Sequence, residues 1–132
     1  MKKAPQKVYV VDNGFVTAKA FNLSENLGRL LENQVFIELI RRGYDTEKSI
    51  FYYRSRNDKE TDFVVRRGTM VESLIQVCYD LSSDRTLKRE VNSLIECAQE
   101  LKCNSLFIIT MNDERTIEKD GYMINVTPIE KF

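Results

Sequence analysis

The stretch between residues 74 and 111 limits the fold of this chain more than any other. Residues 84–102 carry apolar side chains at the spacing of one helix face, with Ser83 or Asp84 as the cap. Before this helix lies a strand-like run, residues 74–80, and after it a nearly continuous apolar run, residues 105–111. A strand, a helix and a strand in this order predict a right-handed crossover to a parallel neighbour, and the apolar run predicts a strand buried on both faces.

A second helix is predicted for residues 24–43, with Ser24 as its cap and Gly43 at its end. Its apolar residues spread nearly all round the helix, which is typical of a buried helix. Two carboxylates, Glu32 and Glu38, are set among them. Glu38 is expected to cap the helix end or to pair with Arg41 or Arg42.

The remaining elements are short strands. Residues 50–54, 61–67 and 74–80 are separated by short polar links and predict an antiparallel meander. Residues 8–11 read as a strand that enters a turn at residues 12–14, and Asp120-Gly121 predicts a hairpin between residues 116–118 and 122–127. The predicted order is strand, helix, three strands, helix, three strands, in one domain spanning residues 1–132.

Composition excludes several kinds of chemistry. The chain of 132 residues has no histidine, which removes Ser-His-Asp and Cys-His catalysis and every histidine-ligated metal site. Any metal would need mainly oxygen ligands, which favours Mg²⁺, Mn²⁺ or Ca²⁺. Three cysteines without a C-x-x-C pair indicate reduced core thiols in a cytoplasmic protein. No apolar run is long enough for a membrane span or a signal peptide, and no P-loop motif for ATP is present.

The net charge of zero conceals an uneven distribution. Residues 1–68 carry 13 basic and 9 acidic side chains, for a net charge of +4, and residues 69–132 carry 7 and 11, for −4. The densest basic stretch spans residues 41–67 and contains Arg54, Arg56 and Lys59. This stretch is either a solvated surface or a face directed toward nucleic acid or an acidic partner.

Strand alternation predicts which polar residues lie together. Asp62 and Val64 share one face of their strand, and Gln76, Cys78 and Asp80 share one face of the next. Together with a carboxylate from the buried helix, these side chains are expected to converge at one edge of the sheet.

Several segments, in this order and spacing, resemble a known family. They are VYVVDNG (8–14), GRLLEN (28–33), ELIRRG (38–43), FYYR (51–54), KETDFVV (59–65), LIQVCYDL (74–81) and LFIIT (106–110). The chain resembles the C-terminal domain of unknown function that follows the ATPase and winged-helix parts of many prokaryotic AAA-type ATPases. The resemblance covers about nine-tenths of the chain and implies that it is the C-terminal fragment of a longer ATPase.

That family is similar in turn to the PD-(D/E)xK nucleases, including archaeal Holliday-junction resolvases. The resemblance implies an α/β, restriction-endonuclease-like domain with an αβββαβ core and a mixed central sheet. It places Glu32, eleven residues before a glycine, at the helix carboxylate of the nuclease pattern. Asp62 falls on the metal-binding aspartate, and Gln76-Val77-Cys78 falls on the E-x-K motif.

The E-x-K positions are where the sequence departs from the nuclease pattern. Nuclease chemistry needs carboxylates to hold Mg²⁺, and a lysine to position the attacking water and to stabilise charge. Gln76 offers a carbonyl oxygen without negative charge, and Cys78 cannot replace a lysine cation. Asp80, Arg54 or Arg56 could compensate in part.

Three functions follow as alternatives. The leading hypothesis is a non-catalytic, nuclease-fold module that serves an ATPase domain of the same polypeptide and binds DNA or a protein, with Arg54, Arg56 and Lys59 as the nucleic-acid contacts. The second is a Mg²⁺-dependent DNA endonuclease that uses Glu32, Asp62 and Gln76, with Glu32 and Asp62 as metal ligands. The third is a structural domain that forms homo-oligomers. In structural alternatives for single residues, Glu32 pairs with a nearby arginine and Asp62 pairs with Arg54 or Arg56.

Overall fold

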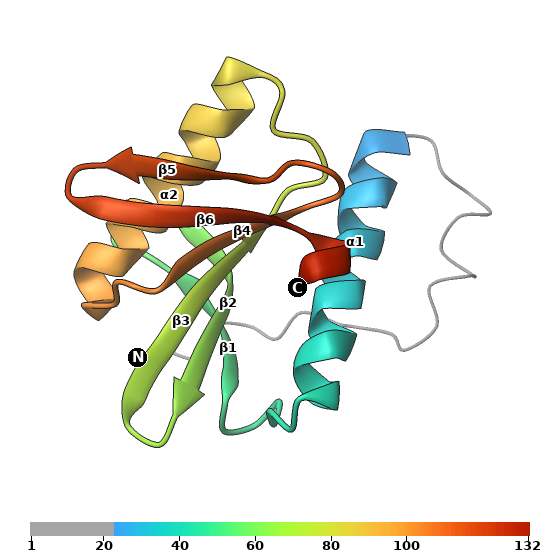
Figure 1. Cartoon of the computed structure of the whole chain (residues 1–132). Helices are drawn as coiled ribbons and strands as arrows, with labels where there is room; N and C mark the ends of the chain where they lie inside the picture. Colours follow the sequence, from blue (N-terminus) through green and yellow to red (C-terminus); the bar gives the residue numbers. More distant parts are fainter. Residues whose placement is uncertain (1–22) are drawn as a thin grey trace.

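The computed structural model describes residues 23–132, so the predicted strand at residues 8–11 and the turn after it lie outside the described residues. Two helices and six strands make up this part of the chain, followed by a short 3-10 helix (Figure 1). In chain order they are α1 (Leu23–Arg41), β1 (Ile50–Arg54), β2 (Glu60–Arg67), β3 (Met70–Val77), α2 (Asp84–Leu101), β4 (Leu106–Thr110), β5 (Arg115–Lys119), β6 (Tyr122–Pro128) and η2 (Ile129–Lys131).

The six strands form one mixed sheet in the order β1-β2-β3-β4-β6-β5. The first three make the predicted antiparallel meander. β3 and β4, which come before and after α2 in the sequence, pair in parallel, as the strand-helix-strand pattern predicted. β4 also pairs in parallel with β6, and β5 pairs antiparallel with β6. Asp120 and Gly121, with φ of 53° and 81°, form the predicted hairpin turn. The predicted α/β class, the αβββαβ order and the mixed sheet are therefore confirmed.

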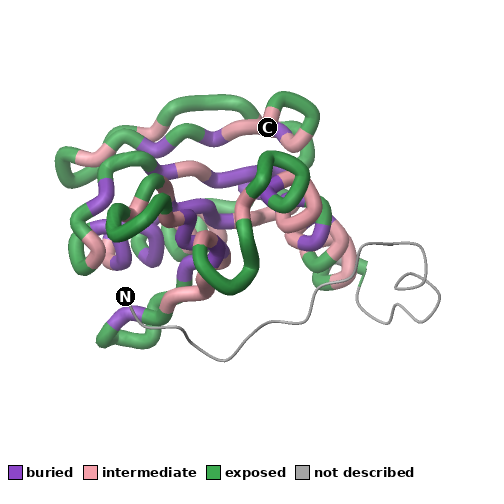
Figure 2. Tube along the Cα trace, turned by 90° about the horizontal axis from the view of Figure 1, so that it is seen from below, coloured by how far each residue is buried: buried purple, intermediate pink, exposed green. Residues whose placement is uncertain are grey.

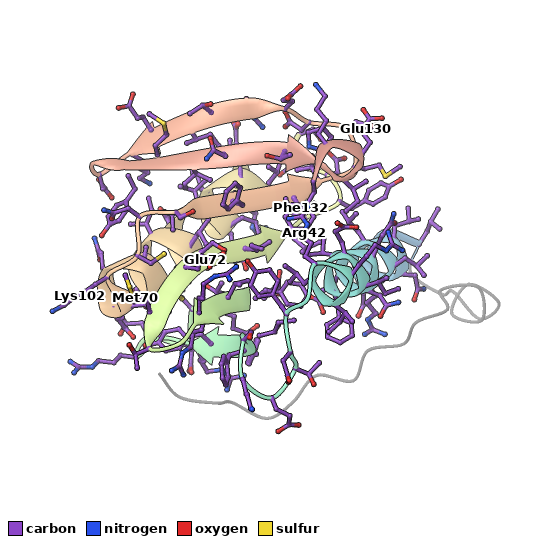
Figure 3. The ribbon with its side chains drawn as sticks, turned by 60° about the horizontal axis from the view of Figure 1, so that its bottom comes forward. Arg42, Met70, Glu72, Lys102, Glu130 and Phe132 are labelled. Carbon is purple, nitrogen blue, oxygen red and sulfur yellow. The ribbon has the colours of Figure 1, made fainter. Side chains whose placement is uncertain are left out.

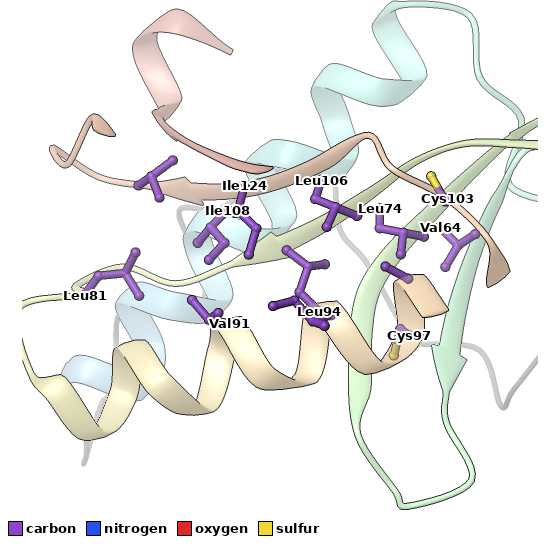
Figure 4. Packing of buried hydrophobic residues seen from close by; sticks show 13 residues of the cluster. Val64, Leu74, Leu81, Val91, Leu94, Cys97, Cys103, Leu106, Ile108 and Ile124 are labelled. Atoms are coloured by element: carbon purple, nitrogen blue, oxygen red, sulfur yellow. The ribbon is translucent and has the colours of Figure 1, made fainter. Parts of the chain in front are cut away.

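The two helices cover opposite faces of the sheet because adjacent strand residues point to opposite sides. Leu94 and Ala98 of α2 pack on Leu74, Ile108 and other apolar side chains of β2, β3, β4 and β6 (Figure 4). The neighbouring strand positions point the other way and pack on α1. Figure 2 shows the buried residues concentrated along the central strands, while the connecting loops are exposed. Both faces of β4 are largely buried, as its apolar run predicted.

The prediction of a buried α1 holds in part. Leu31, Val35 and Leu39 are buried, and so is Asn33, which lies on the opposite side of the helix at 100° per residue. Ile40, however, is 41% exposed. The helix as described begins at Leu23, one residue before the predicted cap position Ser24. Glu38 accepts hydrogen bonds from Arg41 and Arg42, as predicted.

The start of β3 also differs from its prediction. Residues 68–73 were expected to form a loop, but the chain reverses within a tight turn and β3 begins at Met70. Gly68 has a φ of 64°, which glycine adopts without steric cost, so the turn needs few residues. The predicted cap of α2 is confirmed, because the Ser83 hydroxyl accepts a hydrogen bond from the Thr86 N–H. Of the helices within residues 23–132, none combines the length and the hydropathy that a bilayer crossing requires.

The core packing gives a first prediction. Leu94 of α2 is fully buried against the sheet, so Leu94→Ala should lower the free energy of unfolding by about 3 kcal/mol through lost burial and a residual cavity. Chemical denaturation measures this change. Met70→Ala, at a side chain that is 72% exposed, is the control and should change stability by less than about 0.5 kcal/mol. Equal effects of the two variants would contradict the assignment of α2 to the core.

Candidate functional site

The strands β2 and β3 separate at one end, where hydrogen bonds from side chains replace the backbone hydrogen bonds between the strands. Their antiparallel register ends at the pair Phe63 and Ile75, so Asp62 and Gln76 would form the next pair. Instead the Gln76 Oε1 accepts a hydrogen bond from the Asp62 N–H (3.0 Å), and the Gln76 Nε2 donates one to the Glu60 carbonyl (2.9 Å). The Asp62 Oδ2 accepts one from the Val77 N–H (2.8 Å).

A cleft of about 1050 Å³ opens where the strands part. The strand β3 stays paired to β4 along its other edge. Just past the end of β3, the Cys78 N–H still donates a hydrogen bond to the Ile109 carbonyl (2.9 Å). Residues of α1, the loop between β1 and β2, both strand ends and the first half of α2 line the cleft. Elements that are distant in the sequence therefore meet at one end of the sheet.

The structure brings the candidate catalytic residues into this one cleft. Glu32 reaches it from α1, Asp62 from β2, and Gln76 and Cys78 from β3 and the residue after it. Asp80 also lines it. The sequence-based expectation of convergence at one edge of the sheet therefore holds, while the chemical roles assigned to these residues stay predictions.

Gln76 and Cys78, which the resemblance places at the E-x-K positions, both make hydrogen bonds to backbone groups. Gln76 is buried, and each end of its amide contacts the backbone of β2. Cys78 is half-buried and its thiol donates a weak hydrogen bond to the Asp80 carbonyl (3.4 Å). Burial, and next the charge of Glu90, raise the pKa of Cys78 to about 11, so the thiol is neutral at pH 7. A neutral thiol supplies neither the cation of a lysine nor a ligand that suits Mg²⁺.

Glu90 of α2 is a cleft residue that the sequence reasoning missed. Burial, and next the charge of Asp62, raise the pKa of Glu90, while the neighbouring Arg89 and Gln76 act in the opposite direction. Glu90 precedes the buried Val91, at the border of the apolar stripe of α2. That border position is the only signal in the sequence, because amphipathic spacing alone does not tell which border faces a cleft.

The cleft is acidic, but its carboxylates are spread out. Seven acidic and three basic residues line it, which disfavours a polyanion in the absence of bound cations. Within residues 23–132, no three side chains among His, Cys, Asp and Glu are grouped closely enough to hold a metal ion. Glu32 and Asp62 both line this cleft without belonging to such a group.

The predicted nucleic-acid contacts lie on and beside the loop between β1 and β2. Lys59 lines the cleft, and Arg54 pairs with Glu60 at 3.0 Å, while Arg54 and Arg56 are not among the lining residues. Two carboxylates of α2 hold this loop. Glu96 accepts hydrogen bonds from the Ser55 hydroxyl and the Asn57 amide, and Glu100 accepts them from the Arg56 N–H and the Tyr53 hydroxyl. The positive charge of the loop is thus balanced by acidic residues close to it.

A second concavity, of about 410 Å³, lies on the face of the sheet that α1 covers, near the C-terminal end of this helix. Its lining includes Arg42, which stacks on the Phe132 ring at 4.2 Å, and Glu72, which accepts a hydrogen bond from the Tyr44 hydroxyl (2.5 Å) (Figure 3). Apolar side chains of α1, β2, β3 and β4 form the rest of the lining together with a few hydroxyls. None of the predicted catalytic residues lies there.

Comparison with known proteins places the chain among uncharacterised sequences. A family model described as "Domain of unknown function (DUF4143)" matches residues 27–132. The uncharacterised protein MJ1544 of Methanocaldococcus jannaschii is 36% identical over 132 residues, which are 96% of this chain and 29% of that protein. An uncharacterised protein of Haemophilus influenzae is 33% identical over 79 residues, 60% of this chain and 18% of that protein. The chain thus spans less than a third of these curated relatives.

The strand junction at Gln76 gives a second prediction. Gln76→Ala leaves the Asp62 N–H and the Glu60 carbonyl without their partner, which should lower the free energy of unfolding by about 1 to 3 kcal/mol. Urea denaturation measures the change. Gln34→Ala, at an exposed position of α1, is the control. An effect of Gln76→Ala no larger than that of Gln34→Ala would show that the amide does not join the strands.

Two glutamates of α2 give a third prediction, with opposite signs. Hydrogen bonds from Ser55, and next from Asn57, lower the pKa of Glu96, so its ionised form stabilises the fold above the ordinary carboxyl pKa and this contribution is lost as the pH falls. The pKa of Glu90 is raised, so its ionised form destabilises the fold at pH 7. Glu96→Gln should therefore lower the melting temperature at pH 7, and Glu90→Gln should raise it.

Both differences from the unchanged protein should shrink as melting is repeated at falling pH. The effect of Glu90→Gln is lost as the pH falls through the raised pKa of Glu90, and that of Glu96→Gln as the pH falls from the ordinary carboxyl pKa of about 4.3 through the lowered pKa of Glu96. Changes of the same sign in the two variants at pH 7 would contradict the assigned environments.

Proposed function

The chain belongs to the DUF4143 family of domains of unknown function, and we propose that it is a non-catalytic, nuclease-like accessory domain of a larger AAA-type ATPase. In this role it binds nucleic acid or a protein partner in the cytoplasm. The single observation that carries the proposal is the use of Gln76 and Asp62 to join β2 to β3. A nuclease would direct the side chains at these two positions at a metal ion, whereas here the Gln76 amide and the Asp62 carboxylate form hydrogen bonds with the backbone.

The chemistry of the cleft supports an inactive domain. A neutral thiol at Cys78 provides no cation for a phosphate in the transition state. Glu32, Asp62 and Glu90 share the cleft, but the described residues do not group three metal-ligating side chains. Phosphodiester hydrolysis draws its charge stabilisation from a metal ion and a cation, and the described residues of the cleft offer neither three grouped metal ligands nor a cation at position 78.

Two observations support the ATPase context. The resemblance on residues such as 8–14 and 38–43 is to domains that follow an ATPase and a winged helix. More than two thirds of each curated relative lies outside the matched region, which leaves room for a motor domain. This chain carries no P-loop, so ATP hydrolysis would belong to another part of such a protein.

A Mg²⁺-dependent DNA endonuclease, similar to the Holliday-junction resolvases, is the alternative. The observation that favours it is the convergence of Glu32, Asp62 and Gln76, the predicted catalytic set, in one acidic cleft. Glu90 would add a carboxylate that the nuclease pattern does not include. This function requires side chains to move together around a metal ion. A third role, assembly of homo-oligomers, rests on no specific contact in the described residues.

A cleavage assay tests the proposal and is the fourth prediction. The chain should not cut linear or four-way-junction DNA with Mg²⁺ or Mn²⁺, even with protein in large excess over DNA, because the cleft lacks the lysine and the grouped metal ligands. Labelled DNA on denaturing gels measures cleavage. Cutting that persists through purification and is lost in Asp62→Ala would overturn the proposal and support the endonuclease.

Asp62→Ala alone cannot separate lost chemistry from lost folding, since Asp62 also accepts the Val77 N–H. Glu32→Gln is the companion variant, and circular dichroism of both variants monitors their folding. Cutting that is unchanged in both folded variants would identify a contaminating nuclease.

A further inference from the structure

We infer that the flank of α2 next to β5 is a binding surface for the phosphate backbone of nucleic acid. The surface, here called the basic strip, is lined by Arg85, Lys88, Asn92 and Gln99 of α2 and by Arg115 and Lys119 of β5. The inference deepens the proposed function, and rests on it for the class of partner, but it moves the contact away from the loop that carries Arg54 and Arg56.

Helix geometry places the α2 members of the basic strip on one flank. Lys88 follows Arg85 by three residues, Asn92 follows Lys88 by four, and Gln99 follows Asn92 by seven, so these side chains stack along the helix. All four are exposed. The flank extends about 21 Å at 1.5 Å per residue, which matches the rise of about six phosphates along one DNA strand.

Two contacts show that β5 runs beside this flank. The Lys119 Nζ donates a hydrogen bond to the Asn92 Oδ1 at 2.8 Å, near the middle of α2. The Arg115 guanidinium donates one to the Leu81 carbonyl at 3.5 Å, just before the start of α2. Arg115 and Lys119 share the face of β5 that points toward the helix, because strand side chains alternate. The cations of β5 therefore extend the basic strip sideways.

The acidic residues of α2 make their contacts outside the basic strip, although Glu96 follows Asn92 by four residues and so lies in the same row of side chains. Glu90 lines the cleft, and Glu96 and Glu100 hold the loop between β1 and β2. Within the described residues, neither Arg85 nor Lys88 forms an ion pair. The acidic residues near the basic strip are Glu96 between Asn92 and Gln99, Asp84 in the first turn of α2, Asp113, which pairs with Arg115 at 2.9 Å, Glu118 on the other face of β5, and Asp120 in the turn.

The chemistry of the basic strip favours a phosphate backbone over an acidic protein. Lysine, arginine and amide side chains in a line are the donors that contact phosphates and position a protein on a nucleic acid. The loop with Arg54 and Arg56 offers less uncompensated positive charge to a phosphate, because Glu60, Glu96 and Glu100 contact it. In a chain with zero net charge, binding to a polyanion must come from such a local surface.

Fluorescence anisotropy with a labelled mixed-sequence DNA duplex, at several salt concentrations, tests the inference on the whole chain. Lys88→Glu/Lys119→Glu should weaken binding about tenfold or more and reduce the slope of log affinity against log salt by about 2. Lys48→Glu/Lys102→Glu is the matched control, because it makes the same charge change at two exposed lysines outside the basic strip. Thermal melting of each variant shows whether it folds.

Three outcomes would overturn the inference. The first is equal weakening by the strip variant and the control. The second is loss of binding in Arg54→Glu/Arg56→Glu with the strip variant unaffected, which would move the contact back to the loop. The third is no salt-dependent binding, or displacement of the duplex by polyglutamate at matched charge, which would indicate a protein partner. None of these outcomes bears on the cleavage assay, so the proposal of a non-catalytic domain would stand or fall separately.

Discussion

The Gln76 side chain joins two strands that have already parted, and the shape of the candidate site depends on that junction. Its amide bonds to the Asp62 N–H and to the Glu60 carbonyl where the β2–β3 ladder has ended, so neither backbone group loses a partner when the strands separate. An amide can do this because it both donates and accepts, whereas a glutamate at the same position could only accept. The amide at position 76 therefore supplies a structural link that an ionised carboxylate, as the nuclease pattern has there, could not supply.

The same junction determines what the cleft can do. β3 remains with β4 and carries Cys78 toward α2, while β2 leaves with Asp62. Burial and Glu90 keep the thiol neutral, and burial with Asp62 raises the pKa of Glu90. The result is an acidic cleft without a cation at the lysine position of the nuclease pattern. This chemistry supports the proposal of a domain that binds its partner without cleaving it.

The helix α2 connects the features of the molecule because each of its flanks meets a different element. One flank packs on the sheet, a second faces the cleft with Glu90, and the side with Glu96 and Glu100 holds the loop after β1. The flank next to β5 carries cations and amides. The two halves of the sequence have net charges of +4 and −4, but in the fold an acidic cleft and the cations of the flank next to β5 lie on different sides of α2.

The sequence by itself determined those elements whose structure follows from the spacing or order of nearby residues. Amphipathic spacing was enough for α2, the Asp120-Gly121 pair for the β5–β6 hairpin, and the strand-helix-strand order for the parallel pairing of β3 with β4. Alternation along the strands, with the family resemblance, also brought Asp62, Gln76 and Glu32 to one cleft. Only the tertiary structure decided that Ile40 of α1 is exposed, that Gln76 bonds to the backbone, and that Glu90 joins the cleft. Those outcomes depend on which neighbour covers a side chain and on where two strands part, and neither is encoded in the spacing of residues along one element.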